Sequence, residues 1–204
     1  MLNKRNPIER LALALCVLLL MLSAGFYLYT KLYPQPAFEA NPSLGGDFSL
    51  QHLDGPVSLS DFRGKGVILM FGYTSCPDVC PSSLANLAAA LERLSESQQQ
   101  QLQPLFISVD PERDTLEKLD LYSRYFHPQM LGLTADKAEL DPIVSAYGAF
   151  YRKVEMPDSA LAYSVDHSAR IYLIDSSGRL IRFLSHNTPV TELTSAIQQL
   201  LKGN

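Results

Sequence analysis

Two cysteines with three residues between them, Cys76 and Cys80, are the side chains in this chain best suited to chemistry. They lie in the segment Phe-Gly-Tyr-Thr-Ser-Cys-Pro-Asp-Val-Cys-Pro, after an apolar run at residues 67–70 and before leucines at helical spacing. Helical residues four apart share a face, and the N-terminus of a helix favours thiolate over thiol. The pair therefore predicts a site for a soft metal ion, a redox-active dithiol, or both.

Strands and helices that alternate along the chain must position these cysteines. A helix follows each of three predicted strands, and a hairpin stands at either end of the series. The predicted strands and hairpins cover residues 47–59, 67–70, 104–109, 131–134 and 169–184. This order indicates an α/β fold, a three-layer sandwich with a mixed β-sheet.

Two helix starts carry the pattern of an acidic capping box. Asp114 is followed three residues later by Glu117, and Asp136 by Glu139. Such pairs place a side-chain acceptor on the free backbone N–H groups of the first turn. We therefore predict that Asp114 and Asp136 cap the helices that follow them.

Charged residues also follow the strand predicted at residues 104–109. Asp110 and Arg113 come directly after it, as the cysteine turn follows the strand at residues 67–70. Functional groups of α/β sheets gather beyond the carboxyl ends of parallel strands, so we expect both segments at one edge of the sheet. Asp110 and Arg113 could dock a partner, brace the metal loop, or form a structural ion pair.

Residues 11–30 form an uncharged, mainly apolar run that follows Lys4, Arg5 and Arg10. At about 1.5 Å per residue it matches the roughly 30 Å of a bilayer core, and the preceding cations predict a cytoplasmic N-terminus. The alternative is a signal peptide cleaved near Ser23, although the apolar run continues past that point. The predicted parts are a cytoplasmic tail at 1–10, a transmembrane anchor at 11–30, a linker at 31–44 and a domain at 45–204.

Composition and export restrict the remaining possibilities. With 17 basic and 21 acidic residues the net charge is −4, which argues against nucleic acid as a partner. In an oxidising compartment Cys76 and Cys80 could form a structural disulfide. A bridge that closes so short a loop removes little chain entropy from the unfolded state and so adds little stability, which weakens that alternative. Cys16 lies within the apolar run and is interpreted as a small apolar filler.

Three ordered motifs together resemble the Sco/SenC family. They are the cysteine segment, Asp-Pro-Glu-Arg-Asp-Thr at residues 110–115, and Val-Asp-His-Ser at residues 165–168 ahead of a predicted strand. The resemblance covers residue 45 to the last helix. It implies a thioredoxin-like, membrane-anchored copper protein involved in assembling cytochrome c oxidase.

The resemblance implies that Cys76, Cys80 and His167 bind one copper ion per domain. The donor types agree, because thiolate sulfur selects Cu(I) and imidazole suits copper in general, whereas structural zinc usually takes four ligands. Asp166 could orient the ring of His167 from the second shell of ligands, or merely cap a turn. Asp78 could tune the charge at the metal or organise the turn.

The predicted function is that of a copper metallochaperone, which delivers copper to the dicopper site of a haem–copper oxidase. Its partners would be the copper-acceptor subunit of that oxidase and a copper donor protein. The predicted location is the bacterial inner membrane, with one membrane span and the C-terminal domain in the periplasm.

The alternative function is that of a membrane-anchored thiol–disulfide oxidoreductase, which would reduce the cysteines of the copper acceptor through Cys76 and Cys80. Two features disfavour it. Three residues separate the cysteines where such enzymes commonly have two, and no proline stands near Ala169, where they tend to have one. Whether the protein is an enzyme stays open, and the balance favours a binding protein.

Overall fold

The computed structural model describes residues 7–32, 43–157, 159 and 161–203 of the 204-residue chain. The chain divides into two compact units, Met1–Ala37 and Phe38–Asn204. In the first unit, helix α1 spans Pro7–Leu32 and contains the whole segment predicted as a helical anchor. Among the helices of the described residues, however, none is both long enough and apolar enough to cross a membrane. The helix at residues 11–30 is thus confirmed but its membrane-spanning role is not, and most of the predicted tail and linker lies outside the described residues.

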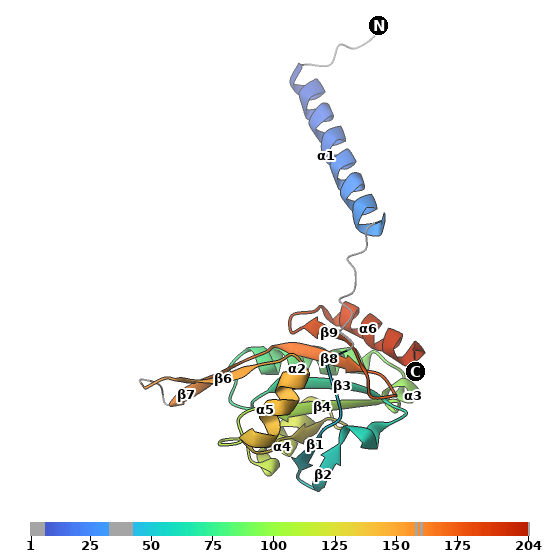
Figure 1. The fold of residues 1–204 in the computed structure, drawn as a ribbon. Coiled ribbons are helices and arrows are strands. Elements are labelled where there is room, and N and C mark those ends of the chain that lie inside the picture. The colour runs from blue at the N-terminus through green and yellow to red at the C-terminus, as the bar shows by residue number, and fades with distance from the viewer. Residues whose placement is uncertain (1–6, 33–42, 158, 160, 204) are drawn as a thin grey trace. The chain divides into compact units, whose positions relative to one another are not determined.

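The second unit is built on a five-stranded sheet of order β5-β4-β3-β8-β9 (Figure 1). β3 is parallel to β4, and β4 to β5, whereas β8 is antiparallel to both β3 and β9. Every residue of β3 and β4 is buried, which confirms the continuous apolar runs as central strands. The five strands are β3 (Gly66–Gly72), β4 (Leu102–Ser108), β5 (Leu131–Leu133), β8 (Arg170–Ile174) and β9 (Leu180–Ser185).

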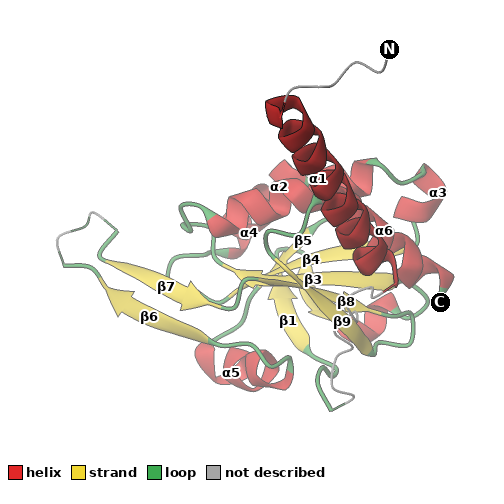
Figure 2. Ribbon diagram, turned by 90° about the horizontal axis from the view of Figure 1, so that it is seen from above, coloured by secondary structure: helices red, strands yellow, loops and turns green. Residues whose placement is uncertain are grey.

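Helices cover both faces of this sheet, so the predicted three-layer arrangement with a mixed sheet is confirmed (Figure 2). One apolar core lies under α2 (Val79–Glu92), α4 (Leu116–Phe126) and α6 (Val190–Lys202). The other lies under α5 (Lys137–Ala146) and the predicted first hairpin, which is formed by β1 (Ser49–His52) and β2 (Gly55–Ser58). Two short helices complete this part of the chain, the 3₁₀ helix η1 (Leu59–Phe62) and α3 (Glu96–Gln99).

A second hairpin, absent from the sequence prediction, precedes β8. Strands β6 (Tyr151–Glu155) and β7 (Tyr163–His167) pair antiparallel as a separate two-stranded sheet, which we call the arm (Figures 1 and 2). β6 has no fully buried residue, and only Tyr151 and Val154 are partly buried. The alternation of apolar and polar residues that marks a half-buried strand is therefore too weak there to be recognised.

Of the two predicted capping residues, one is confirmed and one is wrong. Asp136 accepts a hydrogen bond of 3.0 Å from the Glu139 backbone N–H at the start of α5. At α4 the cap is Thr115, which accepts from the Lys118 backbone. Asp114 is 1% exposed and accepts a hydrogen bond from the backbone of Thr74 instead. Buried donors near the cysteine turn therefore hold the carboxylate that the pattern assigned to the helix end.

The close packing of α4 on β5 yields a test of the fold. A Cβ atom at Gly132 would lie 2.6 Å from the carbonyl oxygen of Leu119 and 2.7 Å from Ser123 Oγ, both in α4. Because a helix backbone cannot move aside cheaply, Gly132→Ala should lower the free energy of unfolding by about 1–3 kcal/mol. Equilibrium urea unfolding measures this change. As a control, Gly203→Ala meets nothing nearer than 3.8 Å and should leave that free energy within about 0.5 kcal/mol; equal losses in both variants would contradict the packing argument.

Candidate metal site

Cys76, Cys80 and His167 come together at the carboxyl end of β3. Their ligand atoms all lie within 4.8 Å of one another, and they form the one such group of His, Cys, Asp and Glu found among the described residues. Cys80 Sγ lies 3.1 Å from His167 Nε2, and the backbone N–H of Cys80 donates to Cys76 Sγ over 3.4 Å. The structure thus brings together all three residues that the resemblance implies as ligands.

The turn between β3 and α2 sets the position of the two sulfurs. The Cys76 N–H donates to the Tyr73 carbonyl oxygen, which closes the turn, and Cys80 lies in the first turn of α2. Asp78 occupies the N-cap position, but its exposed side chain makes no capping hydrogen bond. It contributes through its backbone, which hydrogen-bonds Cys76 and favours the thiolate.

The two thiols have different electrostatic environments. A hydrogen bond from the Cys80 side chain and hydrogen bonds from the backbone lower the pKa of Cys76 to about 5, although partial burial opposes this. The pKa of the Cys80 thiol is raised, first because it donates to the Cys76 sulfur and second because it is buried. Burial also lowers the pKa of His167, so the imidazole is neutral at pH 7. The site thus offers one thiolate, one protonated thiol and one neutral imidazole.

A glycine makes room for the buried sulfur. A Cβ atom at Gly72, in the last position of β3, would lie 2.6 Å from Cys80 Sγ and 2.7 Å from a ring carbon of Phe106. Both atoms belong to packed side chains, because Cys80 and Phe106 are 1% and 0% exposed. Only glycine lets the sulfur approach the backbone of β3 this closely, so Gly72 is a structural requirement of the site.

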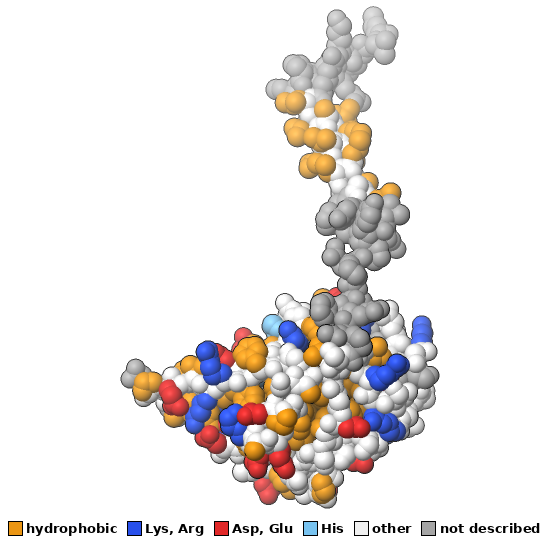
Figure 3. Space-filling model, in the orientation of Figure 1, with side chains coloured by type: hydrophobic (Ala, Val, Ile, Leu, Met, Phe, Trp, Pro, Cys, Tyr) orange, Lys and Arg blue, Asp and Glu red, His pale blue; other side chains and the backbone are white. Residues whose placement is uncertain are grey.

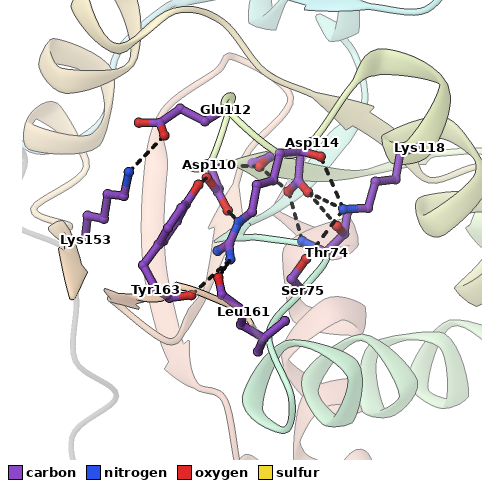
Figure 4. A network of polar contacts seen from close by, with 11 residues as sticks. Thr74, Ser75, Asp110, Glu112, Asp114, Lys118, Lys153, Leu161 and Tyr163 are labelled. Atoms are coloured by element: carbon purple, nitrogen blue, oxygen red, sulfur yellow. Dashed lines mark hydrogen bonds and ion pairs between the residues drawn. The ribbon is translucent and has the colours of Figure 1, made fainter. Parts of the chain in front are cut away.

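Asp114 fixes the residues that precede Cys76, a role that sequence reasoning missed. Its Oδ2 accepts hydrogen bonds of 2.9 Å from the Thr74 N–H and 2.6 Å from Ser108 Oγ, and Thr74 Oγ1 donates to Oδ1 (Figure 4). Lys118 Nζ lies 3.1 Å from the same carboxylate. Hydrogen bonds to a buried charge are strong, so they tie the cysteine turn to the ends of two elements. The available sequence signal was a second aspartate, after Asp110, in the loop that follows β4.

His167 is oriented by contacts other than the predicted one. The Asp166 carboxylate is half exposed and accepts a 2.8 Å hydrogen bond from Arg152 across the arm, so the orienting role predicted for it finds no support. Its charge only raises the pKa of His167 slightly against the larger effect of burial. The imidazole instead packs edge-on against the Tyr73 ring, with 5.5 Å between ring centroids.

The donor set fits a copper ion. Two sulfurs and one imidazole nitrogen are the ligands that soft copper selects, and neither thiol is engaged in a disulfide. The neutral imidazole and the Cys76 thiolate can bind a metal without losing a proton, whereas Cys80 must release one. Cys80 Sγ and His167 Nε2 already lie 3.1 Å apart, so both atoms would hold one ion with little movement of either side chain.

Comparison with known proteins identifies the family. The family model described as SCO1/SenC matches residues 37–202 of this chain. The chain belongs to the SCO1/SenC family. The mitochondrial SCO1 homolog 1 of Arabidopsis thaliana is 40% identical over 156 residues, which cover 76% of this chain and 46% of that protein. An SCO2-like protein of Rickettsia felis is 36% identical over 168 residues, which cover 82% of this chain and 80% of that protein.

A solved structure agrees in fold as well. The crystal structure of Arabidopsis thaliana ScoI with copper bound has 39% sequence identity and a TM-score of 0.73, over 79% of this chain and 99% of that one. This likeness confirms the thioredoxin-like α/β fold with a mixed sheet. The chain spans about half the length of the Arabidopsis SCO1 homolog, which matches it over 46% of its own residues.

The low pKa of Cys76 predicts how its reactivity depends on pH. Because its pKa is about 5 and an ordinary thiol titrates near 9, iodoacetamide should alkylate Cys76 of the reduced, metal-free protein at a rate that changes little from pH 8 to pH 6 and halves near pH 5. Cys80, buried and protonated, should react far more slowly. Mass spectrometry of the peptides separates these sites from Cys16. A Cys76 rate that falls tenfold per unit below pH 8 would contradict the unequal pair.

Proposed function

We propose that this protein binds one copper ion through Cys76, Cys80 and His167 and delivers it to the dicopper site of a haem–copper oxidase during assembly. The observation that carries the proposal is the convergence of two free thiols and one imidazole within 4.8 Å. Sco proteins are copper-binding proteins involved in the assembly of cytochrome c oxidase, which supports this destination.

Unequal exposure of the sulfurs suits copper transfer. Cys76 is partly exposed, whereas Cys80 is 1% exposed. A ligand of the acceptor subunit would therefore reach the metal on the Cys76 side and replace that sulfur first. Cys80 and His167 would hold the ion until further acceptor ligands displace them. The same side would receive copper from a donor protein, since exchange of ligands is reversible.

We further propose that residues 11–30 anchor the protein in the bacterial inner membrane, with residues 45–204 in the periplasm. The uncharged run behind three basic residues supports this location. In membranes from cells that express the full chain, the protein should stay in the pellet after extraction with alkaline carbonate, because a spanning helix is not released by charge disruption. A variant that lacks residues 1–30 and is exported by a cleavable signal serves as the soluble control. Release of the full chain by carbonate would contradict the anchor.

The pair of unequal thiols also favours a second candidate function, reduction of a disulfide in the copper acceptor. The Cys76 thiolate would attack one sulfur of that disulfide and form a mixed disulfide, while the other partner sulfur leaves as a thiolate. Cys80, after loss of its proton, would then attack Cys76 Sγ and release the second partner thiolate. Two electrons pass to the partner, whose thiolates take up protons, and a Cys76–Cys80 disulfide remains.

Substitution of the ligands separates the two functions. His167→Ala removes the imidazole and should lower copper affinity by more than the roughly 10–100-fold lost when a partner of a ligand is removed, while disulfide exchange by the two thiols persists. Cys76→Ser should abolish both activities. Copper affinity measured against a chromophoric chelator, the exchange rate with a model disulfide, and oxidase activity in cells are the readouts.

His186→Ala is the matched control, because His186 is a partly buried loop histidine outside the ligand cluster. It should bind copper as the unaltered protein does. If His167→Ala binds copper weakly but cells still assemble active oxidase, disulfide reduction is the function. If His167→Ala binds copper as tightly as the unaltered protein, the assignment of His167 as a ligand is wrong.

A further inference from the structure

A single loop, residues 110–114, contacts both halves of the metal site (Figure 4). Asp114 holds Thr74, two residues before Cys76, as described above. The other charged residues at the ends of the same loop, Asp110 and Arg113, contact strand β7, whose last residue is His167. The loop is therefore common to the segment that carries the sulfurs and the strand that carries the imidazole.

Arg113 and Asp110 contact the start of β7 through its backbone carbonyl oxygens and through the side chain of Tyr163. Arg113 Nη1 donates to the carbonyl oxygens of Leu161 and Tyr163, over 3.2 Å and 2.9 Å. The Arg113 guanidinium carbon lies 3.6 Å from the centroid of the Tyr163 ring. Asp110 accepts from both residues, 2.5 Å from Arg113 Nε and 2.7 Å from the Tyr163 hydroxyl. Together these contacts hold the backbone carbonyl, the ring and the hydroxyl of Tyr163.

The contacts of Asp110 and Arg113 with β7 are largely buried, unlike the other ion pairs of the arm. Asp110 is 3%, Tyr163 8% and the Arg113 side chain 20% exposed, whereas the side chains of the Arg152–Asp166 pair are 73% and 51% exposed. Exposed pairs are weak because water screens them, but loss of one partner of a buried pair leaves a charge without compensation. Figure 3 shows side chains of both charge signs interspersed on the visible surface of the arm. Besides the packing of Tyr163 and Val165 in the apolar core, the contacts with the loop are therefore the polar contacts that hold β7 in place.

The arm needs such support because its own sheet is small. β6 and β7 pair only with each other among the described strands, and an isolated two-stranded hairpin is marginally stable at best.

Arg113 also approaches His167 by a second route, through the Tyr73 ring. Its guanidinium carbon lies 5.6 Å from the centroid of that ring, which packs edge-on against the imidazole. Displacement of Arg113 would loosen both the strand and the ring that limit where His167 points.

We propose that Asp110 and Arg113 are positioning residues of the metal site. They hold β7 so that His167 Nε2 faces Cys80 Sγ, and thereby set the copper affinity without touching the ion. This inference rests on the proposed copper function, and it assigns a role to residues for which the sequence alone left docking, bracing and a structural ion pair open.

The test is the copper affinity of Arg113→Met, measured on the full chain by competition with a chromophoric chelator for Cu(II). The affinity should fall about tenfold or more, in the range seen when partners of metal ligands are removed. The thiolate-to-Cu(II) absorption should shift toward that of His167→Ala, while the alkylation rate of Cys76 stays within about twofold. Should Arg113→Met fail to fold, Asp110→Asn combined with Arg113→Met leaves no uncompensated charge, and the same loss of affinity is expected.

A double variant decides whether the effect passes through His167. If it does, Arg113→Met should weaken copper binding no further in a protein that already carries His167→Ala. Arg152→Met is the matched control, because it removes an arginine ion pair from the same arm without contact to the loop, and its affinity should be unchanged. Unaltered affinity in Arg113→Met, or an equal loss with and without His167, overturns the inference. Equal affinities of His167→Ala and the unaltered protein would instead overturn the proposed function.

Discussion

The 3.1 Å contact between Cys80 Sγ and His167 Nε2 joins two segments that are 87 residues apart in the sequence. No local interaction can establish it. It requires β3 to deliver the cysteine turn to one edge of the sheet, and the chain to return to that edge through the arm. The site therefore forms only when the whole domain folds. The turn after β3 holds the two cysteines, and the arm holds His167. This separation explains why so many buried polar contacts surround the three candidate ligand side chains.

Burial gives the two sulfurs different chemistry from the same residue type. Gly72 lets Cys80 lie close against the strand backbone, where its thiol keeps its proton and donates to the Cys76 sulfur. Cys76 lies in the turn just before α2, where backbone N–H groups of the first helical turn favour a thiolate. The ligand pair thus combines an accessible anion with a protected thiol. That asymmetry would suit ligand exchange and disulfide exchange equally, so the role of His167 is what distinguishes the two proposed functions.

Much of this arrangement was predictable, since it follows from patterns that are local in sequence. Three such patterns predicted their structures directly: the buried apolar runs of β3 and β4, the leucine spacing of α2, and the turn with two cysteines. The arm was not predicted, because β6 has no fully buried residue and so lacks a clear strand pattern, and because β7 is held in part by contacts with a loop distant in sequence. The same limit applies to Asp114. Its spacing to Glu117 matches a helix cap, but burial beside Thr74 and Ser108 outweighs the local preference.

The two-stranded arm has a dynamic consequence. Local openings of a protein range in free energy from near zero to the cost of global unfolding, and segments with few strand partners lie at the low end. β7 has one strand partner among the described residues, whereas β3 lies at the centre of the five-stranded sheet. An opening of the arm would withdraw the imidazole and expose Tyr163 and Val165 of the apolar core, while the cysteine turn stays on the five-stranded sheet. Such an opening would change the candidate site from three donor atoms to two, and backbone amides of β7 should exchange with solvent before those of β3.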